Sequence, residues 1–347
     1  MTLKKLLLTL ISLPLAILTA CHTDTGNYSI MTVDGAIPSG QIGTTLAHEH
    51  ILVDWIGADS TGYHRWDREE VVEKMLPFVE EAKEAGIETI FEYTPEYLGR
   101  DPYILYSLMQ RSGVNFVTNV GYYGAVENRF MPRLAYRSTA TEIAGRWISQ
   151  TMNGIDGSGI RPGFIKISVA EEAELSDLHQ KIVEAAAITH LETGLTIASH
   201  TVGDIPAMAQ IDFLKQLGVS PDAWIWTHAQ TGSLEGNLQA AGEGAWISLD
   251  GVNANVAEGE EGSIMWYVDR IKSLRDEGYL NQVLLSHDAG WYKPEEPNGG
   301  EVRPYTDLSE HLIPAMLENG FTPYEINRLL VKNPQDAYGI RVRAQES

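Results

Sequence analysis

The sequence predicts an α/β fold of the (β/α)8, or TIM-barrel, class, because eight short apolar runs alternate with longer amphipathic stretches. The 347 residues accommodate one barrel domain of about 250 residues together with extensions. Several runs are apolar on both faces, as in strands of a buried parallel sheet. The competing fold, a doubly wound open sheet, usually has a Gly-rich phosphate-binding turn after its first strand. Thr44–Asp54 contains no such turn, which favours the barrel.

The predicted strands are apolar runs bounded by polar or glycine-containing stretches. They span Thr44–His48, Ile87–Tyr93, Phe116–Tyr122, Gly163–Ser168, Leu195–His200, Trp224–His228, Ala245–Asp250 and Gln282–Asp288. Five of the intervening helices are predicted to start at the capping residues Asp67, Asp101, Ser176, Ser263 and Thr322. Three of them are expected to end at Gly86, Gly194 and Gly278. Strand and helix therefore alternate as a barrel requires.

The N-terminus has the pattern of a bacterial lipoprotein signal peptide. Two lysines precede the apolar run Leu6–Leu18, which is shorter than the ~20 residues that a membrane-spanning helix needs. The run ends in Leu18-Thr19-Ala20-Cys21, which resembles a lipobox, where lipoproteins are cleaved before a lipidated cysteine. Cys21 is the only cysteine, so intramolecular disulfides are excluded. The alternative is a simple secretory signal cleaved at Ala20, with an incidental cysteine.

This pattern divides the chain into three parts. We expect a signal peptide at residues 1–20, a short polar tether at 21–29 and the barrel at 30–347. Lipid on Cys21 would anchor the protein to a membrane of the bacterial cell envelope, on its periplasmic or surface side. The formal net charge of −22 argues against nucleic acid as a partner.

Residues able to bind a metal ion stand at the carboxyl ends of five predicted strands. They are His48 and His50, Lys166, His200, His228 and Asp288. His48 and His50 lie two positions apart on a strand, so both imidazoles point the same way and can bind one ion. Chance surface histidines, or histidines hydrogen-bonded in the core, are the alternative for each residue alone. The complete set favours a metal site, because strand ends meet at one rim of a barrel.

Lys166 is the most informative member of the set. It lies within an apolar strand, where burial of an unpaired ammonium is costly. An ammonium also repels a metal ion and offers no lone pair. A deprotonated lysine can take up carbon dioxide as a carbamate, whose two oxygens could bridge two cations.

With this lysine, the chain resembles the phosphotriesterase family of the amidohydrolase superfamily from about Val33 to Ile340. Supporting matches are Ala85-Gly86-Ile87-Glu88-Thr89-Ile90, Gly99-Arg100-Asp101 and Asn333-Pro334. The resemblance implies two divalent metal ions, usually zinc. It assigns His48, His50 and Asp288 to the more buried ion, and His200 and His228 to the more exposed one. Carboxylated Lys166 and a hydroxide would bridge the two ions. Hydroxide would attack the substrate, and Asp288 would accept its proton.

Two departures from the family pattern bear on the substrate. Members that hydrolyse paraoxon have a histidine after the aspartate that ends the seventh strand, and lactonases often have an arginine there, whereas this chain has Asp250-Gly251. The hydrolytic members also carry an acidic pair soon after the sixth-strand histidine, and the run after His228 has none. A proton relay through those positions cannot exist in the same form. The metal centre is therefore better supported than any one substrate.

We expect a hydrolase acting on a small carboxylic ester, with lactones foremost. The first alternative is a phosphotriester or phosphodiester hydrolase similar to aryldialkylphosphatase, and the second is a catalytically inactive surface binding lipoprotein. Tyr122 and Tyr123, which follow the third strand, and Trp291, which follows Asp288, are candidates for the pocket wall; core packing is the alternative for the tyrosines. His287 should point away from the site. The resemblance also implies a homodimer.

Overall fold

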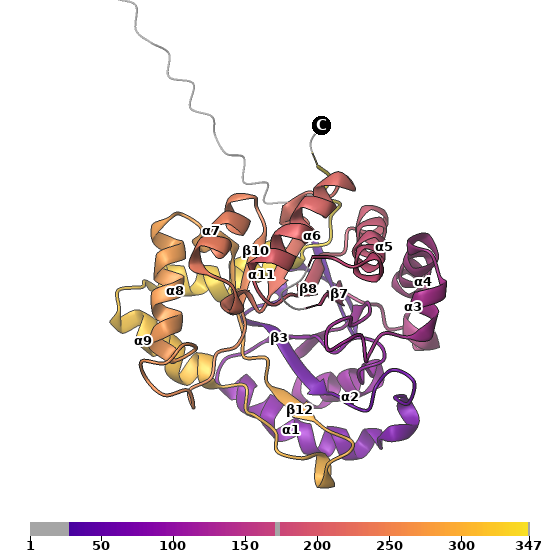
Figure 1. The fold of residues 1–347 in the computed structure, drawn as a ribbon. Coiled ribbons are helices and arrows are strands. Elements are labelled where there is room, and N and C mark those ends of the chain that lie inside the picture. The colour runs from indigo at the N-terminus through magenta and orange to yellow at the C-terminus, as the bar shows by residue number, and fades with distance from the viewer. Residues whose placement is uncertain (1–27, 171–173, 346–347) are drawn as a thin grey trace, which may run out of the picture.

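Parallel strands form the wall of a barrel in the computed structural model, which describes residues 28–170 and 174–345 (Figure 1). The strands are β3 (Thr45–Leu52), β4 (Thr89–Glu92), β5 (Asn115–Val117), β6 (Asn119–Val120), β7 (Phe164–Ser168), β8 (Ile197–His200), β9 (Trp224–Thr227), β10 (Trp246–Leu249) and β11 (Val283–Leu285). β5 and β6 are two parts of the third barrel strand, which is interrupted at Thr118. All eight predicted strands are thus present, within a few residues of the expected ends.

Hydrogen bonds between the first and last strands close the barrel. β4 pairs with β3 and β5, while β6 to β11 pair in sequence order, and every one of these pairings is parallel. The residues after β11 complete the circle, because Asp288 donates its N–H to the carbonyl of His48 and His50 donates its N–H to the carbonyl of Ala289. Closure therefore brings Asp288 beside both histidines of β3, although 238 residues separate it from His50.

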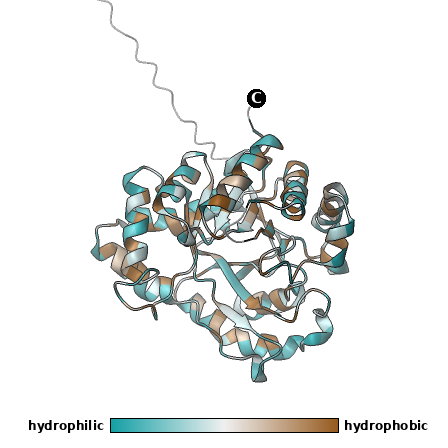
Figure 2. Ribbon diagram, in the orientation of Figure 1, coloured by the Kyte–Doolittle hydropathy of each residue, from teal (hydrophilic) through white to brown (hydrophobic). Residues whose placement is uncertain are grey.

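Helices surround the strands (Figure 1). They are α1 (Arg68–Glu84), α2 (Pro102–Ser112), α3 (Arg133–Arg137), α4 (Ala140–Asn153), α5 (Asp177–Thr193), α6 (Asp204–Gln216), α7 (Leu234–Gly242), α8 (Ile264–Asp276), α9 (Ile313–Glu318), α10 (Pro323–Asn327) and α11 (Asn333–Tyr338). In α1 the buried residues recur at helical spacing, so one side packs on the barrel while hydrophilic residues face outward (Figure 2). No helix of the described residues is long and apolar enough to cross a membrane.

The predicted helix starts agree with the structure because they depend on local capping. Asp67 accepts hydrogen bonds from the N–H groups of Glu69 and Glu70, and Ser176 accepts one from that of His179. Thr322 forms a capping box with Glu325. Each bond satisfies a donor that the first turn of a helix leaves without a partner.

An antiparallel hairpin that the sequence did not predict covers the amino-terminal end of the barrel. It consists of β1 (Ser29–Thr32) and β2 (Gly35–Pro38), and Ile30 packs among residues of the barrel interior. A last short strand, β12 (Gly290–Tyr292), pairs with the end of β3 within the loop that follows β11. The predicted signal peptide, Cys21 and most of the expected tether lie outside the described residues.

Candidate metal centre

One cavity of about 210 Å³ opens where the strands end at their carboxyl side. It is lined by every metal-binding candidate that the sequence singled out, namely His48, His50, Lys166, His200, His228 and Asp288. The remaining wall is mostly apolar or aromatic and consists of Val53, Trp55, Tyr93, Pro95, Leu98, Tyr123 and Trp291. The barrel thus brings the ends of five predicted strands together around one small cavity.

The distances within this set suit metal ligands. Nε2 of His48 lies 3.2 Å from Nε2 of His50 and 3.6 Å from Oδ1 of Asp288. Two ligands bound at about 2.1 Å to one tetrahedral zinc ion would be roughly 3.4 Å apart, which these separations match. Ligating atoms of His48, His228 and Asp288 also lie within 4.8 Å of one another. The rings of His200 and His228 are adjacent, with centroids 4.4 Å apart.

Lys166 is buried, and its Nζ has no hydrogen-bond partner among the described residues. Its Nζ lies 4.9 Å from the ring centre of Tyr93. Burial lowers the pKa of Lys166 to about 7, although Asp250 and Asp288 act in the opposite direction. The amine is therefore readily neutral, which is the form that carbon dioxide can carboxylate. Gly121, which directly follows β6, allows the backbone there to approach Lys166 of β7 closely. A Cβ at position 121 would lie 1.7 Å from the Lys166 carbonyl oxygen.

Asp250 orients two of the histidines, a role that the sequence analysis missed. Its carboxylate is fully buried and accepts hydrogen bonds from Nδ1 of His48 at 2.9 Å and Nδ1 of His228 at 2.8 Å. Burial by itself raises the pKa of Asp250, but the two histidines outweigh it and hold that pKa well below its usual range. A proton on Nδ1 leaves the Nε2 lone pair of each imidazole free for a metal ion. In the sequence, Asp250 ends the seventh predicted strand, and this position at the same rim as the histidines could have indicated its role.

A second buried carboxylate holds the turn that carries Asp288. Glu49 accepts hydrogen bonds from Ser286 Oγ at 2.7 Å, His287 Nδ1 at 2.6 Å and the Ala289 N–H at 2.7 Å. Asp288 itself has a φ of +54°, a left-handed conformation that needs such support. His287 points away from the cavity, as predicted, because neighbouring side chains project in opposite directions. Glu49 alternates with His48 and His50 in the same way.

The aromatic wall differs from the expectation at one residue. Tyr123 lines the cavity, with its hydroxyl 3.3 Å from Nδ1 of His200, and Trp291 lines it beside Trp55. The assignment of Tyr122 to the pocket is not supported, because its ring is fully buried against Trp147 outside the cavity. Consecutive residues at a strand end face opposite ways, so only one of the two tyrosines can reach the pocket.

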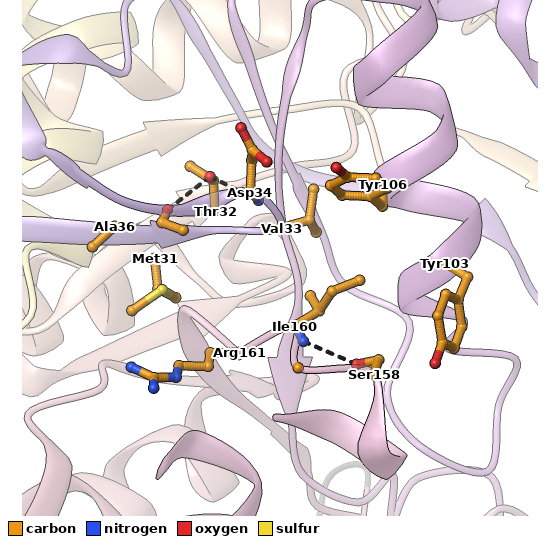
Figure 3. A pocket seen from close by; sticks show the side chains of 12 residues that line it. Met31, Thr32, Val33, Asp34, Ala36, Tyr103, Tyr106, Ser158, Ile160 and Arg161 are labelled. Carbon is orange, nitrogen blue, oxygen red and sulfur yellow. Dashed lines mark hydrogen bonds between the residues drawn. The ribbon is translucent and has the colours of Figure 1, made fainter. Parts of the chain in front are cut away.

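A wider hollow of about 620 Å³ lies beside the β1–β2 hairpin (Figure 3). Tyr103 and Tyr106 of α2 form one side, and the residues from Ser158 to Arg161 form another. Among the described residues, its lining contains no histidine, and the charged side chains there are those of Asp34 and Arg161. Nothing there resembles the cluster of donors at the strand ends, so the smaller cavity is the candidate site.

Comparisons with known proteins match most of the chain. The model of the phosphotriesterase family matches residues 28–338. The phosphotriesterase homology protein of Escherichia coli is 27% identical over 85% of this chain and 98% of its own length, and the aryldialkylphosphatase of Saccharolobus solfataricus is 27% identical over 86% and 96%. The structure of an organophosphorus hydrolase from Deinococcus radiodurans superposes with a TM-score of 0.79 at 24% identity, covering 91% of this chain and 98% of that one. This last likeness concerns the fold alone.

Proposed function

Because the chain belongs to the phosphotriesterase family, we propose that it is a binuclear metal-dependent hydrolase of small uncharged esters, with lactones as its foremost substrates. The observation that carries the proposal is the gathering of four histidines, an unpaired buried lysine and an aspartate around one apolar cavity. The same donor set suits divalent ions that accept nitrogen and oxygen ligands, zinc above all.

The proposed ligands fall into two groups. His48, His50 and Asp288 would hold one ion, His200 and His228 the other, and carboxylated Lys166 would contact both. Two bound ions would lower the pKa of a shared water molecule and polarise the substrate carbonyl. Among the protein groups, Asp288 is placed to accept the proton of that water. Its side chain is 25% exposed, so the proton can pass on to solvent.

The cavity wall supports an uncharged substrate. Apart from Lys166, the described residues that line the cavity include no lysine or arginine, so an anionic substituent held away from the metal ions would have no counter-ion from the protein. A carboxylate on the part of the substrate that faces the apolar wall would be desolvated there without compensation. The volume of about 210 Å³ is below the roughly 300–1,000 Å³ of sites for drug-sized ligands, which favours a compact ring. A neutral phosphotriester remains the alternative substrate.

We expect the zinc-loaded protein to hydrolyse five- and six-membered lactones with a kcat/KM at least about tenfold above that for a dialkyl aryl phosphate, because an apolar pocket of matched size discriminates by roughly this factor or more. A panel of lactones, aryl esters and phosphotriesters, each assayed by product release, measures this ratio. Protein carrying Lys166→Met and treated with zinc in the same way is the control. Faster phosphotriester turnover would favour the alternative hydrolase, and no turnover by protein that binds two metals would favour the binding lipoprotein.

We also propose that lipid on Cys21 anchors the protein to the cell envelope. Tyr28 packs beside Gly339, and the Ile340 N–H donates to the Ser29 carbonyl, so the described chain starts at the amino-terminal end of the barrel. The cavity lies at the opposite end. An anchor attached through a short tether would therefore leave the cavity open to soluble substrates.

In cells expressing the full chain, wild-type protein should incorporate labelled palmitate and sediment with membranes, whereas Cys21→Ser should incorporate none. The physical reason is that no other thiol is present to receive the lipid. Activity per molecule should be equal in both proteins, because the cavity is built from residues of the barrel. Absence of label on the wild-type protein would refute the anchor without touching the proposed hydrolase.

A further inference from the structure

Gln230 forms two hydrogen bonds with Asp250, one through the nitrogen and one through the oxygen of its side-chain amide. It lies in the short helical turn Ala229–Thr231 that follows His228. Its Nε2 donates to Oδ1 of Asp250 at 3.1 Å, and its Oε1 accepts the Asp250 N–H at 3.2 Å. An amide offers a donor and an acceptor together, which no carboxylate or aliphatic side chain does. Gln230 therefore restrains the backbone and the carboxylate of Asp250 at the same time.

The carboxylate that Gln230 restrains has little freedom left. Besides the two imidazoles, Asp250 accepts Ser248 Oγ at 2.9 Å and the His228 N–H at 3.1 Å. Ionised carboxylates have about four lone-pair sites, so the available positions are filled. A displacement of Asp250 would therefore shift the His48 and His228 rings, which depend on it for their orientation.

The missing side chain at position 251 makes this arrangement possible. A Cβ on Gly251 would lie 2.7 Å from Nε2 of Gln230 and 2.7 Å from the hydroxyl of Tyr267. Real Cβ contacts are not this short, so any larger residue would displace one of these groups. Tyr267 comes from α8 and is buried, and burial raises the pKa of its phenol, so it stays neutral. Two uncharged polar groups thus fill the space beside the end of β10.

We infer that Gln230 is a positioning residue of the metal centre, acting through Asp250 on His48 and His228, and that Gly251 is required to leave it room. The inference rests on the proposed function only in taking the two histidines as metal ligands. Gln230 does not line the cavity, so its effect should fall on metal binding and on kcat, with KM unchanged.

The experiment compares Gln230→Ala, Gln230→Glu, Gly251→Ala and the double variant Gly251→Ala/Gln230→Ala. Zinc affinity is measured by competition with a chelator, and the absorption spectrum of cobalt-loaded protein reports ligand geometry. We expect Gln230→Ala to weaken zinc binding by about tenfold, the lower end for loss of an outer-sphere partner. Gln230→Glu should weaken it by about a hundredfold, because a second carboxylate would face Asp250. The cobalt spectrum should change in both.

The double variant tests the role of Gly251. Gly251→Ala alone should weaken zinc binding. The loss in the double variant should be smaller than the sum of the two single losses, since removing Gln230 relieves its contact with the new Cβ and leaves only the contact with Tyr267. Gln150→Ala is the matched control, a buried glutamine on α4 that should bind zinc as the wild type does. Wild-type affinity and an unchanged cobalt spectrum in Gln230→Ala would overturn the inference alone. A wild-type protein that binds no zinc would overturn the proposed function and the inference together.

Discussion

Replacing Lys166 with methionine is expected to remove bound metal and hydrolytic activity together. Methionine retains most of the side-chain volume in an apolar strand, but it cannot carry a carbamate, so the contact proposed between the two ions is lost. Bound metal ions would stabilise the charge of the transition state by several kcal/mol. Without them the activation free energy rises by that amount, which corresponds to a fall in kcat/KM of about 10³-fold or more.

Metal content by elemental analysis and kcat/KM on the best lactone of the panel measure this effect. The unfolding temperature of the metal-free variant should equal or exceed that of the metal-free wild type. The reason is that the variant no longer buries an amine without a partner among the described residues. That comparison separates a lost metal site from a misfolded barrel. A variant that keeps two metal ions and full activity would show that Lys166 has no part in the centre.

The second large effect is expected for Asp250→Asn. An asparagine keeps the shape but has one acceptor oxygen, so it cannot accept from Nδ1 of His48 and Nδ1 of His228 in the present arrangement. One imidazole then loses the partner that fixes its tautomer. Loss of such a partner usually costs 10- to 100-fold in metal affinity or activity, and about 100-fold is expected here because one carboxylate serves two ligands.

Chelator competition and kcat on the metal-saturated protein test this prediction. Asp101→Asn is the control, since Asp101 is also a buried carboxylate, but it caps α2, pairs with Arg68 and does not line the cavity. The control should lower the unfolding temperature while zinc affinity stays at the wild-type value. Equal zinc affinity in Asp250→Asn and wild type would mean that the histidines are held by the barrel alone.

The elements that depend on local interactions could be predicted from the sequence. Helix starts could be predicted because capping involves neighbours within a few residues, as at Asp67, Ser176 and Thr322. The hairpin β1–β2 was missed because Ile30 is ordered by the barrel interior rather than by its neighbours. The interruption of the third strand at Thr118 was likewise invisible in an apolar run.

For the site, the sequence by itself determined the identity of the donor residues and the rim where they meet. This is possible because parallel strands in a barrel all end on one side, so residues at strand ends become neighbours whatever their separation in the chain. That rule places Lys166 near His48 without knowledge of any contact.

Only the tertiary structure decided which way the side chains at those ends face and what supports them. Tyr123 rather than Tyr122 reaches the cavity, because the phase of a strand's alternation is set by its pairing with its neighbours. Asp250 and Gln230 acquire their roles from distances between separate loops, and Gly251 matters for the space it leaves. The orientation of side chains and the free volume around them depend on packing between distant segments. The spacing of residues along the sequence therefore does not determine them.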